Sequence, residues 1–291
     1  MTRLDRRCFL KSSAALAAMA GVHWADLAQA KGTPSAEKLG WHLGCQAYSF
    51  NRFTFFEAVD KNVSVGLKYI EAYPGQKLSK EHTDGVGHGM SAAARKIMQK
   101  KLDDAGVKLQ CYGVVGLSKD EKGSRQVFDF AKEMGISVIV SEPGADAFDT
   151  LDKLCEEYQI SVGLHNHPKP SPYWNPDVVL ERCKGHSKRI GSCADTGHWM
   201  RSDIKPLDAL KKLEGHIVSF HFKDLNKFGG GAHDVPWGTG QADVKALLAE
   251  IKRQGLRCPF SIEYEHNWDN SVPEIAKCVE YFEKIAAELA G

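Results

Sequence analysis

The sequence predicts a single (β/α)8 barrel, an α/β fold, and three observations support this prediction. From Leu43 onward, short runs rich in β-branched and aromatic residues alternate with segments of helical period. Eight such pairs follow one another in about 250 residues, without a linker or a change in composition. Glycines close several helical segments before the next strand, as Gly106, Gly135, Gly215 and Gly255 do. A doubly wound open sheet is the main alternative, but it usually has fewer strands and a glycine-rich first turn that this sequence lacks.

The elements can be placed in order by residue number. We expect strands at 43–49, 69–73, 108–115, 137–142, 161–166, 190–195, 217–223 and 259–265. Helical patterns follow them at 54–65, 91–105, 124–134, 147–158, 176–185, 206–214, 243–254 and 273–289. Because barrel enzymes carry their chemistry at the carboxyl ends of the strands, functional residues are sought at those ends.

The first thirty residues differ in kind from the rest. The pair Arg6-Arg7 precedes an apolar stretch at 14–22 and an Ala-x-Ala site at 28–30. This order is typical of a cleaved export signal, and the arginine pair resembles the twin-arginine signal in particular. A structural N-terminal helix is the alternative. We expect a signal peptide over 1–30, a catalytic barrel over 31–291 and a periplasmic mature protein.

Composition narrows the class of partner. Hydrophobic residues make up 43% and charged residues 26%, with a net charge of +1, as in an ordinary globular protein. No basic run suggests nucleic acid, and no apolar stretch after residue 30 is long enough to span a bilayer. Seven cysteines follow residue 30 without a C-x-x-C pair, which predicts core filling. The expected partner is a small molecule, and dimerisation stays open.

Almost every predicted strand ends in an ionisable residue. These residues are Glu71, Glu142, His165, His167, Asp195, His198, His221, Lys223, Glu263 and Glu265. Charged groups inside a barrel are costly unless they are paired or bound to metal, so this ring predicts a cation at its centre. Strand alternation turns His165, His167, His221, Lys223, Glu263 and Glu265 toward the barrel interior.

Three carboxylates and one imidazole of this ring would make a metal site. They are Glu142, Asp195, His221 and Glu263. A mostly oxygen donor set suits Mn²⁺, Mg²⁺ or Co²⁺, and Zn²⁺ is also compatible. Any one of these residues alone could be an ordinary salt-bridged strand end. Alternation allows either Glu263 or Glu265 as the last ligand.

Four segments carry a resemblance to a known family. They are Ser141-Glu142-Pro143, Asp195-Thr196-Gly197-His198, His221-Phe222-Lys223-Asp224 and Ile262-Glu263-Tyr264-Glu265. In this order and at strand ends, they resemble the sugar phosphate isomerase/epimerase family of xylose-isomerase-like barrels, over nearly the whole mature length. The resemblance implies that Glu142, Asp195, His221 and Glu263 ligate one divalent ion. It also implies that Glu142 and Glu263 are acid/base groups on opposite faces of the substrate.

The implied chemistry is α-proton transfer on a sugar. A metal that chelates a carbonyl and a neighbouring hydroxyl stabilises the enediolate, while one carboxylate removes a proton and another returns it. We expect substrate contacts from His167, His198, Lys223, Glu71 and Trp237. Lys223 could instead pair with Glu265, and Glu71 could be half of a buried structural pair.

The long glycine-rich loop at 229–240 follows the seventh strand, where barrel enzymes often hold a phosphate. It has few basic residues, and an exported enzyme seldom meets sugar phosphates. We therefore expect an unphosphorylated sugar or keto-sugar as substrate.

Three other functions compete with the isomerase or epimerase. A keto-sugar or keto-inositol dehydratase, or a glycoside lyase, would use the same site, and relatives of this barrel include inosose dehydratases. An apurinic endonuclease would need several zinc ions and a basic face, which the sequence does not suggest. A non-catalytic sugar-binding protein would predict a damaged ligand set.

Overall fold

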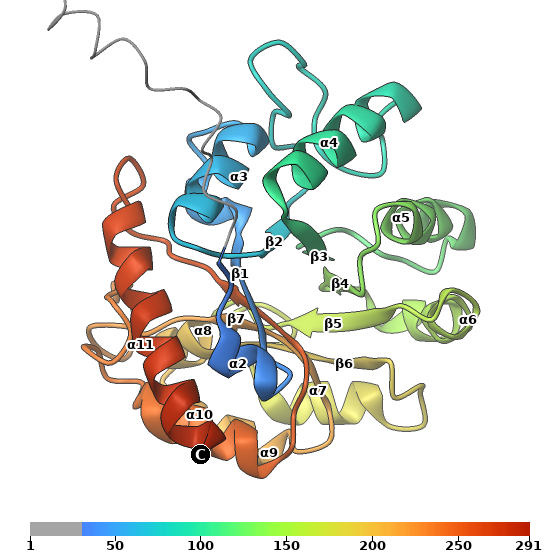
Figure 1. Ribbon diagram of the computed structural model, residues 1–291. Coiled ribbons are helices and arrows are strands. Elements are labelled where there is room, and N and C mark those ends of the chain that lie inside the picture. The colour runs from blue at the N-terminus through green and yellow to red at the C-terminus, as the bar shows by residue number, and fades with distance from the viewer. Residues whose placement is uncertain (1–30) are drawn as a thin grey trace, which may run out of the picture.

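Eight parallel strands close into a barrel in the computed structural model, which describes residues 31–291 (Figure 1). The strands are β1 (His42–Gln46), β2 (Tyr69–Ala72), β3 (Lys108–Tyr112), β4 (Val138–Ser141), β5 (Ser161–His165), β6 (Ile190–Asp195), β7 (Ile217–Phe222) and β8 (Pro259–Ile262). Each strand pairs with the next, and β8 closes the ring on β1 with Phe260 opposite Leu43. The predicted single-domain (β/α)8 barrel is confirmed.

The main helices surround the strands on the outside of the barrel (Figure 1). They are α2 (Pro34–Lys38), α3 (Phe55–Ser64), α4 (Ala92–Ala105), α5 (Glu121–Glu133), α6 (Phe148–Tyr158), α7 (Pro176–Cys183), α8 (Thr196–Arg201), α9 (Pro206–Lys212), α10 (Val244–Arg253) and α11 (Val272–Ala290). Two 3₁₀ turns add η1 (Ala47–Phe50) and η2 (Ala145–Ala147). All eight predicted helices are present, whereas the short helices α2 and α8 were not predicted.

Strands β1, β3 and β8 each end three residues earlier than predicted. After β1, the Gln46 side chain accepts a hydrogen bond from the backbone N–H of Tyr48 and starts the turn η1. After β8, the N–H of Tyr264 donates to the hydroxyl of Ser49 at 2.8 Å and not to a neighbouring strand. Local side-chain hydrogen bonds therefore divert the backbone from the sheet at the end where the site lies.

Helix ends follow the signals in the sequence. Thr54 and Glu57 form a capping box at the start of α3. Ser91 accepts a hydrogen bond from the N–H of Ala94 and caps α4. Gly106 ends α4 in the left-handed region, at a φ of 64°. The Asp120 side chain caps α5, which explains why this helix begins three residues before the predicted position.

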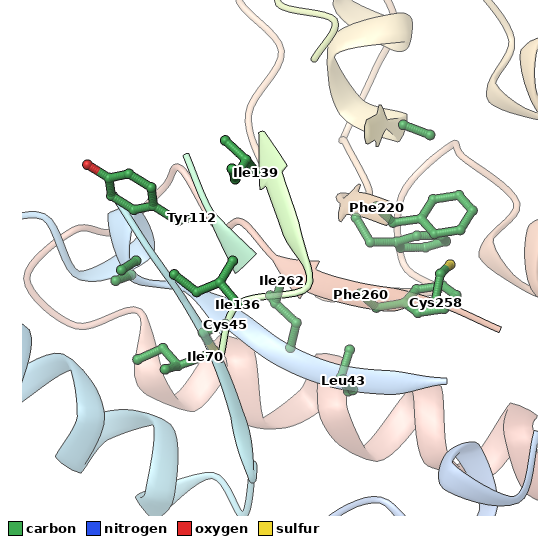
Figure 2. Packing of buried hydrophobic residues seen from close by; sticks show 14 of the residues in the cluster. Leu43, Cys45, Ile70, Tyr112, Ile136, Ile139, Phe220, Cys258, Phe260 and Ile262 are labelled. Carbon is green, nitrogen blue, oxygen red and sulfur yellow. The ribbon is translucent and has the colours of Figure 1, made fainter. Parts of the chain in front are cut away.

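Buried apolar side chains form two core clusters. The larger one lies between strands and helices, and Figure 2 shows Leu43, Ile70, Phe260 and Ile262 within it. A second, smaller cluster contains Cys111, Val138, Val140 and Cys193. Val138 and Val140 share the strand parity of position 142, and Cys193 shares that of position 195, so this cluster fills the barrel interior below the strand ends.

Two further expectations concern export and cysteine use. The predicted signal peptide lies outside the described residues. Among the described helices, none is long and apolar enough to cross a membrane. The seven cysteines of the described part are free and buried, which confirms that they fill the core.

Candidate metal centre and substrate pocket

Asp195 joins strand β6 to helix α8. It is the last residue of β6 and the N-cap of α8, and its Oδ1 accepts a hydrogen bond from the backbone N–H of His198 at 2.6 Å. The Asn166 side chain accepts from the N–H of Asp195 at 2.8 Å and donates to its carbonyl at 2.9 Å. Oδ1 therefore caps helix α8, and Oδ2 is left to contact side chains at the other strand ends.

His221 lies near the end of β7, fully buried between two glutamates. Its Nε2 is 3.0 Å from Oε1 of Glu71, and its Nδ1 is 3.1 Å from Oε2 of Glu263. The other Glu71 oxygen accepts a hydrogen bond from the hydroxyl of Ser261. If Nε2 donates its proton to Glu71, the lone pair of Nδ1 is free for a metal beside Glu263. Of the two roles predicted for Glu71, the structure places it in a buried pair.

His165 completes a group of four potential ligands, although the sequence analysis did not assign it to the metal. His165, Asp195, His221 and Glu263 each offer one ligand atom, and these atoms lie within 4.8 Å of one another. Nε2 of His165 is 3.5 Å from Oδ2 of Asp195 and, although buried, has no hydrogen-bond partner among the described residues. Two imidazoles and two carboxylates form a donor set that first-row divalent ions accept. These residues therefore fit a divalent metal ion.

Glu142 lies beside this group and not within it. Its Oε1 accepts hydrogen bonds from the backbone N–H of His167 at 3.1 Å and from the Ser171 hydroxyl at 3.0 Å, and it is 2.8 Å from His167 Nδ1. The His165 ring lies between the two carboxylates: Nδ1 is 3.7 Å from Glu142 and Nε2 faces Asp195. The structure thus brings together three of the four predicted ligands and places His165 where Glu142 was expected.

The environment keeps Glu142 ionised. Burial alone would raise its pKa, but the nearby His165 ring and the hydrogen bonds from His167 hold the pKa of Glu142 well below its usual value. Glu142 and His165 can also form a second group of potential ligands with His167. Oε1 of Glu142 already accepts from a backbone amide and a hydroxyl, so its geometry favours a hydrogen-bonded partner of His167.

Lys223 follows β7, and its side chain is fully buried. Its ammonium contacts the carboxylates of Asp195 and Glu263, while Oε2 of Glu265 is 4.0 Å away. Burial alone would lower the pKa of Lys223, but the charges of Asp195 and Glu263 raise it above its usual value. Its closest contacts are therefore with two potential metal ligands and not with Glu265, the partner that the sequence suggested.

Glu263 and Glu265 have different partners, although both can form a third group of potential ligands with His198. Glu263 belongs to the group of four, whereas Glu265 contacts the guanidinium of Arg201. Arg201 also lies 3.0 Å from Asp234 Oδ2 and donates to Nδ1 of His198 at 3.0 Å. Burial lowers the pKa of His198 well below its usual value, so the ring is neutral and can accept this hydrogen bond.

A pocket of about 290 Å³ opens beside these residues. It is lined by Gln46, Tyr48, Tyr73, Pro74, Gly113, Val114, His167, Glu263 and Glu265. This volume is near the lower end of the range for small-molecule sites, about 300–1,000 Å³. Within the described chain, the lining contains no lysine or arginine.

Aromatic rings form one side of the pocket. The ring centroids of Tyr48 and Tyr73 are 5.2 Å apart, and those of Tyr48 and Trp268 are 5.7 Å apart, both edge to face. Tyr48 keeps 39% of its surface exposed, which is unusual here for a large apolar side chain. The place of Tyr48 and Tyr73 in the pocket lining was not predicted, because both residues were assigned to strands, at 43–49 and 69–73.

Four of the five predicted substrate contacts do not line the pocket: Glu71, His198, Lys223 and Trp237. Trp237 is buried against Phe222 and Phe282, at centroid distances of 4.9 and 5.8 Å, so its ring is core packing. His198 and Lys223 are buried. His167, by contrast, lines the pocket.

The glycine-rich loop after β7 is built around Asp224. Its carboxylate accepts hydrogen bonds from the backbone N–H groups of Gly238, Gly240 and Ala242, at 2.9, 2.9 and 3.0 Å. A Cβ at Gly240 would lie 2.3 Å from Oδ1 of Asp224, so only glycine allows this approach. Amides that a phosphate could use are thus satisfied by a carboxylate of the chain itself.

The fold and site define a barrel with a candidate metal centre at its strand ends. The family model described as xylose isomerase-like TIM barrel matches residues 59–285. The chain therefore belongs to the xylose isomerase-like TIM barrel family, as its strand-end motifs predicted.

Solved structures add relatives at several distances. A putative uncharacterized protein from Parabacteroides distasonis is 31% identical, with a TM-score of 0.69, over 84% of this chain and 99% of that one. A D-tagatose 3-epimerase-like protein is 20% identical, with a TM-score of 0.66, over 85% and 99%. A xylose isomerase-like barrel from Mycobacterium smegmatis in complex with magnesium is 12% identical, with a TM-score of 0.67, over 86% and 98%. No curated protein matches the chain.

Proposed function

We propose that the protein is a divalent-metal-dependent sugar isomerase or epimerase. The observation that carries this proposal is the group of His165, Asp195, His221 and Glu263, with the unpartnered Nε2 of His165 directed into it. Because two of these four donors are imidazoles, the set favours Mn²⁺, Co²⁺ or Zn²⁺ over Mg²⁺. The magnesium-bound and epimerase-like relatives are consistent with this class of site.

The chemistry is proton transfer next to a carbonyl. A divalent ion held by these residues would stabilise the negative charge that develops on the substrate oxygens when the α proton leaves. Glu263 lines the pocket and is the candidate base. His167, in the loop after β5, lines the same pocket and is the candidate to return the proton. Glu142 then acts through His167, whose Nδ1 it holds at 2.8 Å.

The pocket favours a neutral sugar. The two glutamates in its lining would repel an anion, and the described lining residues include no cation to attract one. The amides of the glycine-rich loop are occupied by Asp224. We therefore propose an unphosphorylated sugar or keto-sugar about the size of one ring.

Metal content tests this proposal. We expect about one divalent ion per chain in the purified protein, measured by mass spectrometry, and loss of that ion in His165→Ala and His221→Ala. Glu57→Gln is the matched control, since Glu57 caps helix α3 and belongs to none of the groups of potential ligands, and it should keep the metal. Wild-type protein that binds no Mn²⁺, Co²⁺ or Zn²⁺ would rule out the proposal.

The reaction type needs a second measurement. In D₂O, an isomerase or epimerase incorporates deuterium at the α carbon, and the mass of the product otherwise equals that of the substrate. A dehydratase releases water as well. The dehydratase stays a candidate because the pocket group across from Glu263 is an imidazole, His167, which can protonate a leaving hydroxyl.

Export is also proposed, on the evidence of Arg6-Arg7 and the apolar stretch that follows. Replacing both arginines with lysine should leave the protein in the cytoplasm of a bacterial host that has the twin-arginine route. Unchanged recovery from the periplasm would contradict this assignment.

A further inference from the structure

Lys223 shares its carboxylate partners with the proposed metal. Its ammonium contacts Oδ2 of Asp195 and Oε2 of Glu263. Glu263 Oε2 is also the oxygen next to His221 Nδ1, and Asp195 Oδ2 is the oxygen that His165 Nε2 faces. A divalent ion and an ammonium group would therefore bind the same two oxygens.

The surroundings fix Lys223 in this position. Its backbone N–H donates to Thr196 Oγ1 at 2.8 Å, and its carbonyl accepts from the same hydroxyl at 2.7 Å. Its aliphatic stem passes Gly197 so closely that a Cβ on that glycine would lie 2.7 Å from Cβ and Cδ of Lys223. The Thr196-Gly197 pair thus directs the Lys223 side chain toward the group of four. The position of the lysine is therefore fixed by the fold.

We propose that Lys223 is an internal cation that competes with the metal and weakens its binding. Two carboxylates attract a divalent ion strongly, and a buried ammonium between them leaves one net negative charge instead of two. When a metal binds, Glu265 is the nearest other carboxylate that can take the ammonium, with Oε2 at 4.0 Å. This inference rests on the proposed metal centre.

The competition has a consequence for the fold. With Lys223 present, one of the two negative charges of Asp195 and Glu263 is balanced by the chain itself, so folding depends less on the ion. Without Lys223, the two buried carboxylates depend on the metal for balance. Removing the lysine should therefore strengthen metal binding and make the melting temperature depend on metal.

The test compares Lys223→Met with wild-type protein, using Mn²⁺ as the probe. Lys223→Met has a similar side-chain length without the charge. We expect its dissociation constant for Mn²⁺, measured by chelator competition, to be at least about tenfold lower than that of wild type. We also expect EDTA to lower the melting temperature of Lys223→Met more than that of wild type.

Two controls separate charge from structure. Lys223→Arg keeps a cation beside the two carboxylates and should not bind Mn²⁺ more tightly than wild type. Lys169→Met removes an exposed lysine from the loop after β5, where its ammonium lies 4.2 Å from the centroid of the Trp174 ring, and should change neither quantity. If Lys223→Met folds only with metal, chelator competition on the Mn²⁺-loaded variant still gives a dissociation constant to compare with that of wild type.

Other outcomes are distinguishable. Weaker or equal Mn²⁺ binding by Lys223→Met would overturn this inference, because the lysine would then support or ignore the metal. Absence of Mn²⁺ binding to both proteins would instead overturn the proposed function.

Discussion

Oε1 of Glu71 lies 3.0 Å from Nε2 of His221, on the opposite side of the ring from Glu263. A carboxylate at this position fixes the tautomer of a ligating histidine and the direction of its free nitrogen. The contacts from Glu71 through His221 to Glu263 therefore connect strand β2 to strand β7 and to the end of strand β8, at the carboxyl ends of the strands.

The first prediction follows from this contact. Glu71→Gln should weaken Mn²⁺ binding by about 10- to 100-fold, the usual cost of losing such a partner. Chelator competition measures the change. Glu57→Gln makes the same substitution at the capping box of α3 and should leave Mn²⁺ affinity unaltered. Equal affinities for all three proteins would show that Glu71 does not position His221.

The loop after β7 provides a prediction on stability. Asp224→Ala removes the acceptor of three backbone N–H groups, so the free energy of unfolding should fall by about 2–5 kcal/mol. Denaturant unfolding followed by circular dichroism measures this change. Metal content should stay at the wild-type level, since Asp224 does not belong to the group of four. A fall of less than about 0.5 kcal/mol would mean that the loop does not depend on this carboxylate.

The aromatic wall predicts an effect on substrate binding. Tyr48→Ala should raise KM by roughly fivefold to tenfold, because an aromatic contact of this kind contributes about 1 kcal/mol. The value of kcat should change less than KM, since Tyr48 lines the pocket and does not belong to the group of four. Trp237→Phe is the matched aromatic control, because Trp237 packs in the core and does not line the pocket. A larger effect of Trp237→Phe on KM would contradict this assignment.

Glu57 predicts how stability responds to acid. Hydrogen bonds from the backbone N–H and side chain of Thr54 lower the pKa of Glu57 to about 2. The folded pKa is thus below the unfolded value near 4.3, so the contribution is complete above that value and disappears as pH falls toward 2. Because a third of the side chain is exposed, we expect only about 1 kcal/mol. Wild type should exceed Glu57→Gln in unfolding free energy at pH 6, and the two should converge near pH 2.

The fold could be predicted almost entirely from the sequence, because each of its eight units repeats the same hydrophobic periods and helix-end signals. The site could be predicted only in part. Strand parity turned His165, His221 and Glu263 inward, and all three now lie in the group of four. Parity does not say which strand ends share a metal. The sequence favoured Glu142 as a ligand, whereas the structure places His165 in the group of four and Glu142 in a second group with His165 and His167.

The positions of Trp237 and Tyr48 could not be predicted from sequence patterns. Trp237 adjoins the site in sequence, but the loop turns around Asp224 and carries the indole into the core. Tyr48 carries no motif, and its place in the pocket depends on the turn η1 that follows β1. In both cases the path of a loop decides whether the side chain lies in the pocket or in the core, and tertiary hydrogen bonds fix that path.

Asp195 has a consequence for motion in this protein. One side chain ends a barrel strand, starts a helix and faces the group of four. His165 and His221 also belong to barrel strands, and Glu263 follows β8 directly. Barrel strands are among the last parts of a protein to open locally, so these side chains should keep their spacing throughout a catalytic cycle. Substrate entry and product release then depend on the pocket side chains Tyr48 and Tyr73. We expect any rate-limiting motion to occur there.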